Sequence, residues 1–133
     1  MIELFCVDNI PIEYLLQSMT DTIYKILPAS SWEEAATSGA FRGSALDLQD
    51  GYIHFSTAAQ VRETAAKHFG GISGLVLVAV QAEVLGTALE WEPSRGGDLF
   101  PHLYAPLATG LASWVKPLPL GDDGRHTFPQ LQD

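Results

Sequence analysis

The feature that most constrains this fold is a run of aliphatic residues without a polar interruption, Leu75-Val76-Leu77-Val78-Ala79-Val80. A continuous apolar run of strand length, rather than an alternating one, is typical of a strand that is buried on both faces. The run therefore predicts a central strand, around which the remaining strands and helices are arranged.

Further strand signals lie on both sides of this run. Residues 22–27 are rich in β-forming side chains and stop at Pro28, so they predict the first core strand. Three more strands are predicted at residues 52–56, 86–92 and 112–115. Strict alternation of strands and helices is not sustained along the chain. We therefore expect an α+β fold, a single domain with a mixed, mostly antiparallel sheet, rather than a doubly wound one.

Two helices are predicted from capping boxes, in which Ser or Thr precedes Glu or Gln by three residues. The first box starts at Ser30 or Ser31 and predicts a helix that ends near Gly39, a residue that can adopt the left-handed conformation after a helix. Residues 41–50 follow this helix and are predicted to form a loop that ends in an Asp-Gly turn.

The second box joins Thr57 to Gln60 and predicts a helix that closes at Gly70-Gly71. Apolar residues of this segment recur with helical spacing, while charged and amide residues cover the opposite side, so one face is expected to pack on the core. The apolar residues are Ala58, Val61, Ala65 and Phe69.

Composition and charge limit the classes of function. The chain has 133 residues, 47% of them hydrophobic, which fits one domain with one core. Its net charge of −9 repels phosphate backbones, so non-specific nucleic-acid binding is not expected. The single cysteine, Cys6, cannot form an intrachain disulfide, and no apolar run approaches the roughly 20 residues that span a bilayer. We expect a soluble, cytoplasmic protein without membrane contact.

Three segments of the chain differ in character. Residues 1–21 carry scattered apolar side chains and are expected to form an N-terminal extension that packs on the domain or on a second copy of the chain, which would make a homo-oligomer. Residues 22–118 are expected to form the domain itself. Residues 119–133 are rich in Gly, Asp and Pro and are expected to form a flexible C-terminal tail.

The best candidate for chemistry is the stretch around His54. In an extended strand alternate side chains face opposite ways, so Tyr52, His54 and Ser56 are predicted to line one face, with Ile53 and Phe55 on the other. A neutral imidazole both donates and accepts hydrogen bonds, which suits it to orient a ligand. The alternative is a structural histidine that is hydrogen-bonded to backbone.

Two further stretches carry candidate site residues. His102 and Tyr104 share a face if their segment is extended, which suits a pocket wall; the alternative is a pair of half-buried polar residues that cover the core. Glu92 could act as a base or hold a ribose hydroxyl, and Arg95 precedes a Gly-Gly turn whose backbone N–H groups could approach a phosphate. The alternative for both charged residues is plain solvation.

Metal and serine-hydrolase chemistry have little support. No two histidines stand four residues apart, and Cys6 has no neighbouring ligand, so a metal site is not expected. The G-x-S-x-G motif of many hydrolases is absent. A hydrolase or metal enzyme that uses His54, Glu92 and His102 is therefore the third-ranked hypothesis.

Taken together, four stretches resemble the DUF952 family, small bacterial and plant proteins of undefined function. They are residues 23–26 (Ile-Tyr-Lys-Ile), 51–57 (Gly-Tyr-Ile-His-Phe-Ser-Thr), 91–93 (Trp-Glu-Pro) and 100–107 (Phe-Pro-His-Leu-Tyr-Ala-Pro-Leu). The resemblance covers about residues 22–118. That family is similar in fold to the ADP-ribosyltransferases, which implies a split, mixed β-core that binds NAD in a cleft.

The resemblance also implies roles for residues. It implies a cleft built from the first strand, with Tyr24 and Lys25, the His54 strand and the segment with His102 and Tyr104. Lys25 would hold the adenosine ribose, His54 and Ser56 would lie near the nicotinamide, and Glu92 is the candidate to polarise the ribose 2′-hydroxyl. The chain has no clear E-x-E or Q-x-E pair placed as that family would need it, and no recognisable R…S-T-S set.

The leading functional hypothesis is therefore a protein that binds NAD or a related small nucleotide around His54 and His102, with ADP-ribosyl transfer or glycohydrolase chemistry. The candidate catalytic residues are His54, Glu92 and His102. The candidate cofactor-binding residues are Tyr24, Lys25, Tyr52, Ser56, Arg95 and Tyr104. The alternative is a non-catalytic binding module for a metabolite or a protein partner, so the sequence leaves open whether the protein is an enzyme.

Overall fold

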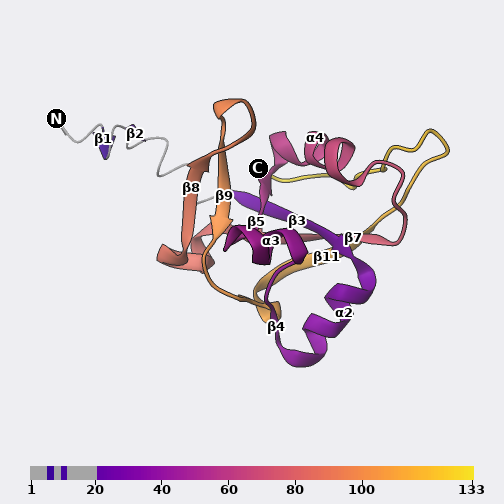
Figure 1. Cartoon of the computed structure of the whole chain (residues 1–133), viewed down its shortest axis with the longest axis horizontal. Helices are drawn as coiled ribbons and strands as arrows, with labels where there is room; N and C mark the ends of the chain where they lie inside the picture. Colours follow the sequence, from indigo (N-terminus) through magenta and orange to yellow (C-terminus); the bar gives the residue numbers. More distant parts are fainter. Residues whose placement is uncertain (1–5, 8–9, 12–20) are drawn as a thin grey trace.

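The computed structural model describes residues 6–7, 10–11 and 21–133, although not the side chains of the first four or of Arg95. Its main sheet has four strands in the order β11-β7-β3-β6, and every strand pair in it is antiparallel. Figure 1 shows β3 and β7 side by side through the middle of the domain. The bounds are β3 Thr22–Pro28, β6 Ser56–Thr57, β7 Leu75–Gln81 and β11 Ala112–Leu118.

A second, three-stranded antiparallel sheet has the order β5-β9-β8. Its strands are β5 Ile53–His54, β8 Leu89–Pro93 and β9 Leu99–Leu103. Two small ribbons pair β4 (Ala40–Phe41) with β10 (Leu107–Ala108) and β1 (Cys6–Val7) with β2 (Ile10–Pro11). The fold is thus α+β with antiparallel sheets, as the sequence predicts.

In the part of the chain that the structure describes, three helices accompany the sheets: α2 Ala29–Ser38, α3 Ala45–Asp50 and α4 Ala58–Phe69. Short 3₁₀ turns at Ala82–Ala88, Arg95–Gly97 and Thr109–Leu111 join the strands of the second half. Figure 1 shows α2 and α4 on opposite sides of the β3–β7 pair and α3 close to β5.

The central strand β7 is buried on both faces, as its aliphatic run predicts. Val78 and Val80 belong to one apolar cluster, with α2, whereas Leu77 and Ala79 belong to a second cluster, with α4. All four side chains have no exposed surface. Burying one Val or Leu side chain contributes about 1.5–3 kcal/mol, so this strand is a main source of stability.

Helix α4 matches its prediction closely. Thr57 and the Gln60 side chain form the expected capping box at the start of α4. Val61 and Ala65 are buried against the sheet, and Ala58 and Phe69 pack at the edge of the same cluster. Apolar side chains at helical spacing thus bury one face of α4.

The C-terminal segment, for which the sequence predicts a flexible tail, lies against the domain. Phe128 and Leu131 pack on the apolar cluster of α4, and the guanidinium of Arg62 lies 5.3 Å from the Phe128 ring centroid. The Tyr24 hydroxyl donates to the carbonyl of Gln132 (2.7 Å) and accepts from its N–H (2.8 Å).

Three local predictions need correction. The predicted strand 52–56 is two short strands in different sheets, because β5 pairs with β9 whereas β6 pairs with β3. Residues 41–50 include a helix, α3, instead of forming only a loop. The capping box at Ser30 or Ser31 does not form, because the residue before α2 is Pro28, two or three residues earlier, and both serines lie inside the helix.

The expected role of residues 1–21 in oligomer formation falls almost wholly on residues outside those described. Within the described part of the chain, no helix is both long enough and apolar enough to span a membrane.

Candidate functional site

The site is organised by Asp47, a residue that the sequence analysis did not select. Ser44 accepts a hydrogen bond from the Asp47 N–H, and the Asp47 carboxylate accepts one from the Ser44 N–H, which together form a capping box at the start of α3. Gly51 ends the helix in the left-handed conformation, at φ 89°. This short, capped turn of helix places Asp47 in the interior, where it is 2% exposed.

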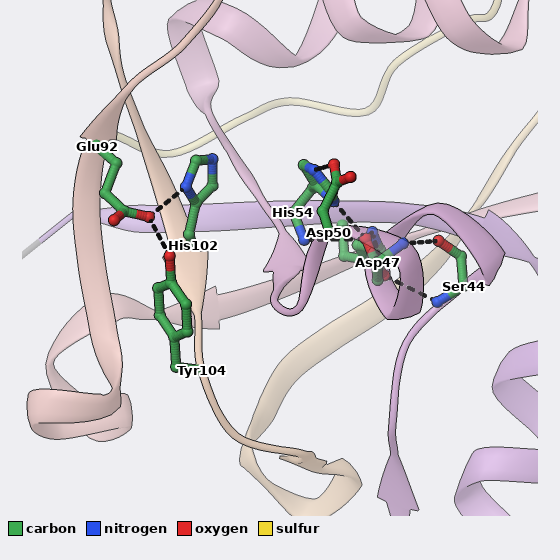
Figure 2. Close-up of polar contacts among 8 residues, drawn as sticks. Ser44, Asp47, Asp50, His54, Glu92, His102 and Tyr104 are labelled. Atoms are coloured by element: carbon green, nitrogen blue, oxygen red, sulfur yellow. Dashed lines mark hydrogen bonds and ion pairs between the residues drawn. The ribbon is translucent and has the colours of Figure 1, made fainter.

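Donors from two strands hold the Asp47 carboxylate, in addition to the Ser44 N–H (Figure 2). The Lys25 ammonium on β3 lies 3.0 Å from Oδ1 and 2.9 Å from Oδ2. His54 on β5 contacts Oδ1 twice, from its backbone N–H at 3.1 Å and from ring Nδ1 at 2.6 Å. Asp47 therefore ties α3 to both sheets.

The electrostatics of this buried pair favour the charged carboxylate. Burial raises the pKa of Asp47, but the hydrogen bond from His54, the charge of Lys25 and the Ser44 N–H outweigh it and hold the pKa well below its usual range. Burial also lowers the pKa of Lys25, and the attraction of Asp47 opposes that effect. A buried lysine with this carboxylate as partner is a structural ion pair, which leaves little of its charge for a ligand.

His54 bridges two carboxylates. Its Nδ1 meets Asp47, and its Nε2 lies 2.9 Å from Oδ2 of Asp50, at the half-exposed end of α3. A neutral imidazole carries only one N–H, so both bonds form only when His54 carries a proton on each nitrogen. Both ring nitrogens are thus engaged within the protein, and His54 serves to position α3.

Glu92 and His102 form a second carboxylate–histidine pair. Oε1 of Glu92 accepts from Nδ1 of His102 and from the hydroxyl of Tyr104, each at 2.7 Å (Figure 2). These two bonds lower the pKa of Glu92, and the bond to Glu92 raises the pKa of Tyr104 to about 12. Burial lowers the pKa of His102, which is 3% exposed.

The pairing of β8 with β9 explains why these groups meet. Glu90 stands opposite His102, and Glu92 stands opposite Phe100, so Glu92 and His102 are diagonal neighbours on one face of the ribbon. Tyr52 completes the arrangement, because its ring stacks on the His102 ring with centroids 4.0 Å apart and planes inclined by 24°. One face of the His102 imidazole is therefore covered.

A cavity of about 410 Å³ lies beside these groups. It borders the part of β3 beyond Tyr24, where β6 no longer pairs with that strand, and α3 and α4 contribute to its walls. Its polar lining residues include Lys25, Asp47, His54, Ser56, Thr64, His68 and His102, and its apolar ones include Leu46, Phe69 and Phe100. Small-molecule sites commonly have about this volume and a mainly apolar wall with few polar groups.

The Nε2 atom of His102 is a polar group of this cavity for which the described residues supply no partner. Figure 2 shows the Nδ1 edge of the ring turned to Glu92 and the Nε2 edge turned away from it. His102 lines the cavity, whereas Glu92 does not. Among the described residues, nothing forms a hydrogen bond with Nε2. None of their wholly buried side-chain nitrogens or oxygens lacks a partner, so Nε2 is the part of this ring that is open to solvent.

Ser56 and Thr64 make a second polar group in the wall. Their hydroxyl oxygens lie 2.9 Å apart, and Thr64 donates to the Gln60 carbonyl in the preceding turn of α4. That carbonyl can only accept, so both bonds form together when Ser56 donates to Thr64. The lone pairs of Ser56 then remain to accept hydrogen bonds from a ligand.

The structure brings most of the predicted residues together. His54, His102, Lys25, Tyr24 and Ser56 line the cavity. Other predicted residues pack behind it: Tyr52 on His102, and Glu92 and Tyr104 on the far side of that ring. The prediction that Tyr52, His54 and Ser56 share one face is wrong in part, because Ser56 lies in the main sheet whereas His54 lies in the second sheet. The side chain of Arg95 lies outside the described residues.

Two of these residues have their polar groups occupied by the protein itself. The Tyr24 hydroxyl is bonded to Gln132, and Lys25 is paired with Asp47. Sequence reasoning missed Asp47, Thr64 and His68. A Ser-x-x-Asp pattern at residues 44–47 is a capping-box signal that would have pointed to Asp47; no comparable signal marks the other two. Over the described residues, no group of three or more His, Cys, Asp or Glu side chains is arranged to hold a metal ion.

The fold and the site thus define a small α+β domain in which a buried histidine, paired with a carboxylate, lines a cavity. The family model "Protein of unknown function (DUF952)" matches residues 26–115, and the chain belongs to this family. No curated protein matches the chain.

Solved structures of protein CC0527 from Caulobacter crescentus are similar to the chain. A crystal structure is 51% identical, covers 80% of this chain and 93% of that one, and has a TM-score of 0.78. A solution NMR structure is 52% identical, covers 78% of this chain and 90% of that one, and has a TM-score of 0.72.

Proposed function

We propose that the protein binds a ribose-containing small molecule of the nucleotide class, NAD being the first candidate, with the ribosyl end inside the cavity lined by His102 and Ser56. The observation that carries this proposal is the Nε2 atom of His102, which belongs to a largely buried ring that lines a cavity of ligand size and lacks a partner among the described residues. A hydrogen bond from a ligand to this atom would contribute about 0.5–1.5 kcal/mol.

The hydrogen-bonding polarity of the cavity indicates the kind of ligand. Glu92 is charged and only accepts, so His102 donates from Nδ1, and the neutral ring presents Nε2 as an acceptor. Ser56 also presents lone pairs, because its own hydrogen is given to Thr64. Two acceptors in an otherwise largely apolar wall suit a ligand with several donors on a compact ring, such as the hydroxyls of a ribose or the amide of nicotinamide.

The charges favour a neutral group inside the cavity. Lys25 is neutralised by Asp47, and Asp50 and Glu92 lie close behind the walls. A pyrophosphate is therefore expected to remain at the mouth, where His68 is exposed, while the ribosyl end enters.

The choice of NAD follows the resemblance of this sequence to a family similar in fold to ADP-ribosyltransferases. We propose an ADP-ribosyltransferase-like arrangement of the split β-core on the same ground. ADP-ribosyl transfer or glycohydrolysis are the reactions that would follow. A non-catalytic binding module remains the second candidate, since the engagement of His54 and Lys25 within the protein gives those two residues a structural role.

A thermal-shift titration with NAD, ADP-ribose and nicotinamide riboside tests the proposal. At a hundredfold excess over Kd, a ligand of the native state adds about 2.7 kcal/mol, which raises Tm by several degrees. His102→Asn keeps a group at the Nδ1 position for Glu92 but removes Nε2, and His126→Asn makes the same change at a histidine that does not line the cavity. We expect a rise in Tm with wild type and His126→Asn and a smaller rise with His102→Asn. No rise with any of the three ligands would refute the proposal.

A further inference from the structure

The Glu92–His102 pair has the geometry of an acid–base pair, beyond that of a binding contact. A histidine works as a base when one nitrogen is held by a carboxylate and the other faces the reacting group. Here Nδ1 lies 2.7 Å from Glu92, and Nε2 faces the cavity without a partner among the described residues. Tyr104 donates to the same Glu92 oxygen and so fixes the carboxylate that fixes the ring.

The surroundings keep the ring in a reactive form. Tyr52 stacks on one face at 4.0 Å and covers it, and the lone pair of Nε2 lies in the ring plane, where a proton donor approaches it. Burial lowers the pKa of His102, with the charge of His54 acting in the same direction and Glu92 opposing both. The imidazole is then neutral near pH 7, as a base requires.

We propose that His102 is the general base of a hydrolytic reaction at the anomeric carbon of a ribosyl ligand, with Glu92 and Tyr104 as its positioning residues; this inference rests on the proposed function. For NAD the step balances as follows. The bond between C1′ and the nicotinamide nitrogen breaks, and its electron pair neutralises the pyridinium ring. Water forms the new C1′–O bond, and Nε2 of His102 takes the water proton and later releases it to solvent.

The structure also separates this base from the other histidine of the site. Both ring nitrogens of His54 meet carboxylates, Asp47 and Asp50, so neither is available to water in the cavity. The sequence treated both histidines as catalytic candidates. The hydrogen bonds assign the chemistry to His102 and leave His54 a structural residue.

The tautomer of His102 gives a test that needs no ligand. Side-chain ¹⁵N NMR at pH 7 is expected to show Nδ1 protonated and Nε2 unprotonated in wild type. In Glu92→Gln the amide can turn its NH₂ toward Nδ1, so we expect a loss of the single tautomer. The titratable groups that face the ring are Glu92 from β8, Tyr104 after β9, Tyr52 and His54 at β5 and Asp50 from α3. Finding Nε2 protonated in wild type would overturn the inference.

Turnover gives the second test, read as nicotinamide released from NAD. General-base catalysis contributes about 10²–10⁴-fold, so His102→Asn is expected to lower kcat by that factor. His126→Asn is the matched control and should keep wild-type kcat. Glu92→Gln should lower kcat more than it raises KM and should shift the acid limb of the pH profile, which a merely structural role would not do.

The outcomes separate this inference from the proposed function. If wild type binds NAD in the thermal-shift titration but releases no nicotinamide, the general-base role is refuted and the binding proposal stands. Equal release by wild type and His102→Asn also refutes the role of His102. If no NAD, ADP-ribose or nicotinamide riboside binds, both proposals fall.

Discussion

Asp47 is predicted to be the carboxylate on which the stability of this domain depends most. The change Asp47→Asn keeps the shape of the side chain but removes the charge that neutralises Lys25, which is 7% exposed. Removing one partner of a buried ion pair costs about 3–5 kcal/mol, because the other charge stays buried without compensation. The total free energy of unfolding of a native domain is about 5–15 kcal/mol. The loss in Asp47→Asn should therefore be large and easily measured.

For a domain of this size, this loss of free energy of unfolding lowers Tm by roughly 10–20 °C. Urea unfolding and a thermal scan are the assays. Asp50→Asn is the matched control, since it makes the same change three residues on in α3, where the carboxylate meets His54 at the surface. An exposed pair is worth about 0–1 kcal/mol, so this control should stay close to wild type.

Two further measurements test whether the loss comes from the uncompensated charge of Lys25. The double variant Lys25→Met, Asp47→Asn lacks the orphaned charge, so it should be more stable than Asp47→Asn alone. The folded-state pKa of Asp47 is depressed, so its contribution is complete above the unfolded value of about 3.9 and is lost as pH falls through the folded value. The difference in free energy of unfolding between wild type and Asp47→Asn should therefore become smaller below about pH 4. If Asp47→Asn costs no more than Asp50→Asn at pH 7, the reasoning is wrong.

Three other changes test the fold. Ser44→Ala removes the side-chain half of the α3 cap and should cost about 0.5–2 kcal/mol in urea unfolding; no measurable change would show that the cap is unimportant. Tyr24→Phe removes the hydroxyl that is hydrogen-bonded to the backbone N–H and carbonyl of Gln132, and it should make the C-terminal segment more sensitive to limited proteolysis. An unchanged cleavage rate would show that these two hydrogen bonds do not hold the segment in place. Gly39→Ala places a side chain on a residue at φ 94° and should lower the free energy of unfolding by about 1–2 kcal/mol. Gly110 has no positive φ and no close neighbours, so Gly110→Ala should not cause this loss. Equal losses in the two variants would argue against conformational strain at Gly39.

Local sequence signals predicted the parts of the fold that depend on neighbouring residues. The aliphatic run of β7 and the Thr57–Gln60 box of α4 each combine a clear period or cap with apolar residues that face the core. The cap of α2 was misplaced because Pro28 already has the extended conformation of a residue before a helix, so Ser30 and Ser31 fall inside it. Strong local signals were sufficient where tertiary contacts did not compete.

The site could be predicted only in part, because its key contacts join distant segments. His54, Glu92 and His102 were chosen by residue type, and the register of β8 with β9 brings Glu92 to His102. Asp47 was missed because α3 is short and its partner Lys25 stands 22 residues away along the chain. No periodicity in the sequence indicates such a pair, whereas the folded chain makes it the centre of the site.

The central claim is that Nε2 of His102 binds a ribosyl ligand in the cavity, and calorimetric titration of NAD tests it most directly. Wild type, His102→Asn and His126→Asn would be titrated side by side at pH 7. A lost hydrogen bond of about 0.5–1.5 kcal/mol corresponds to a roughly 2- to 13-fold rise in Kd. The account predicts that rise for His102→Asn alone. Equal affinity in all three proteins, or no heat of binding in wild type, would contradict it.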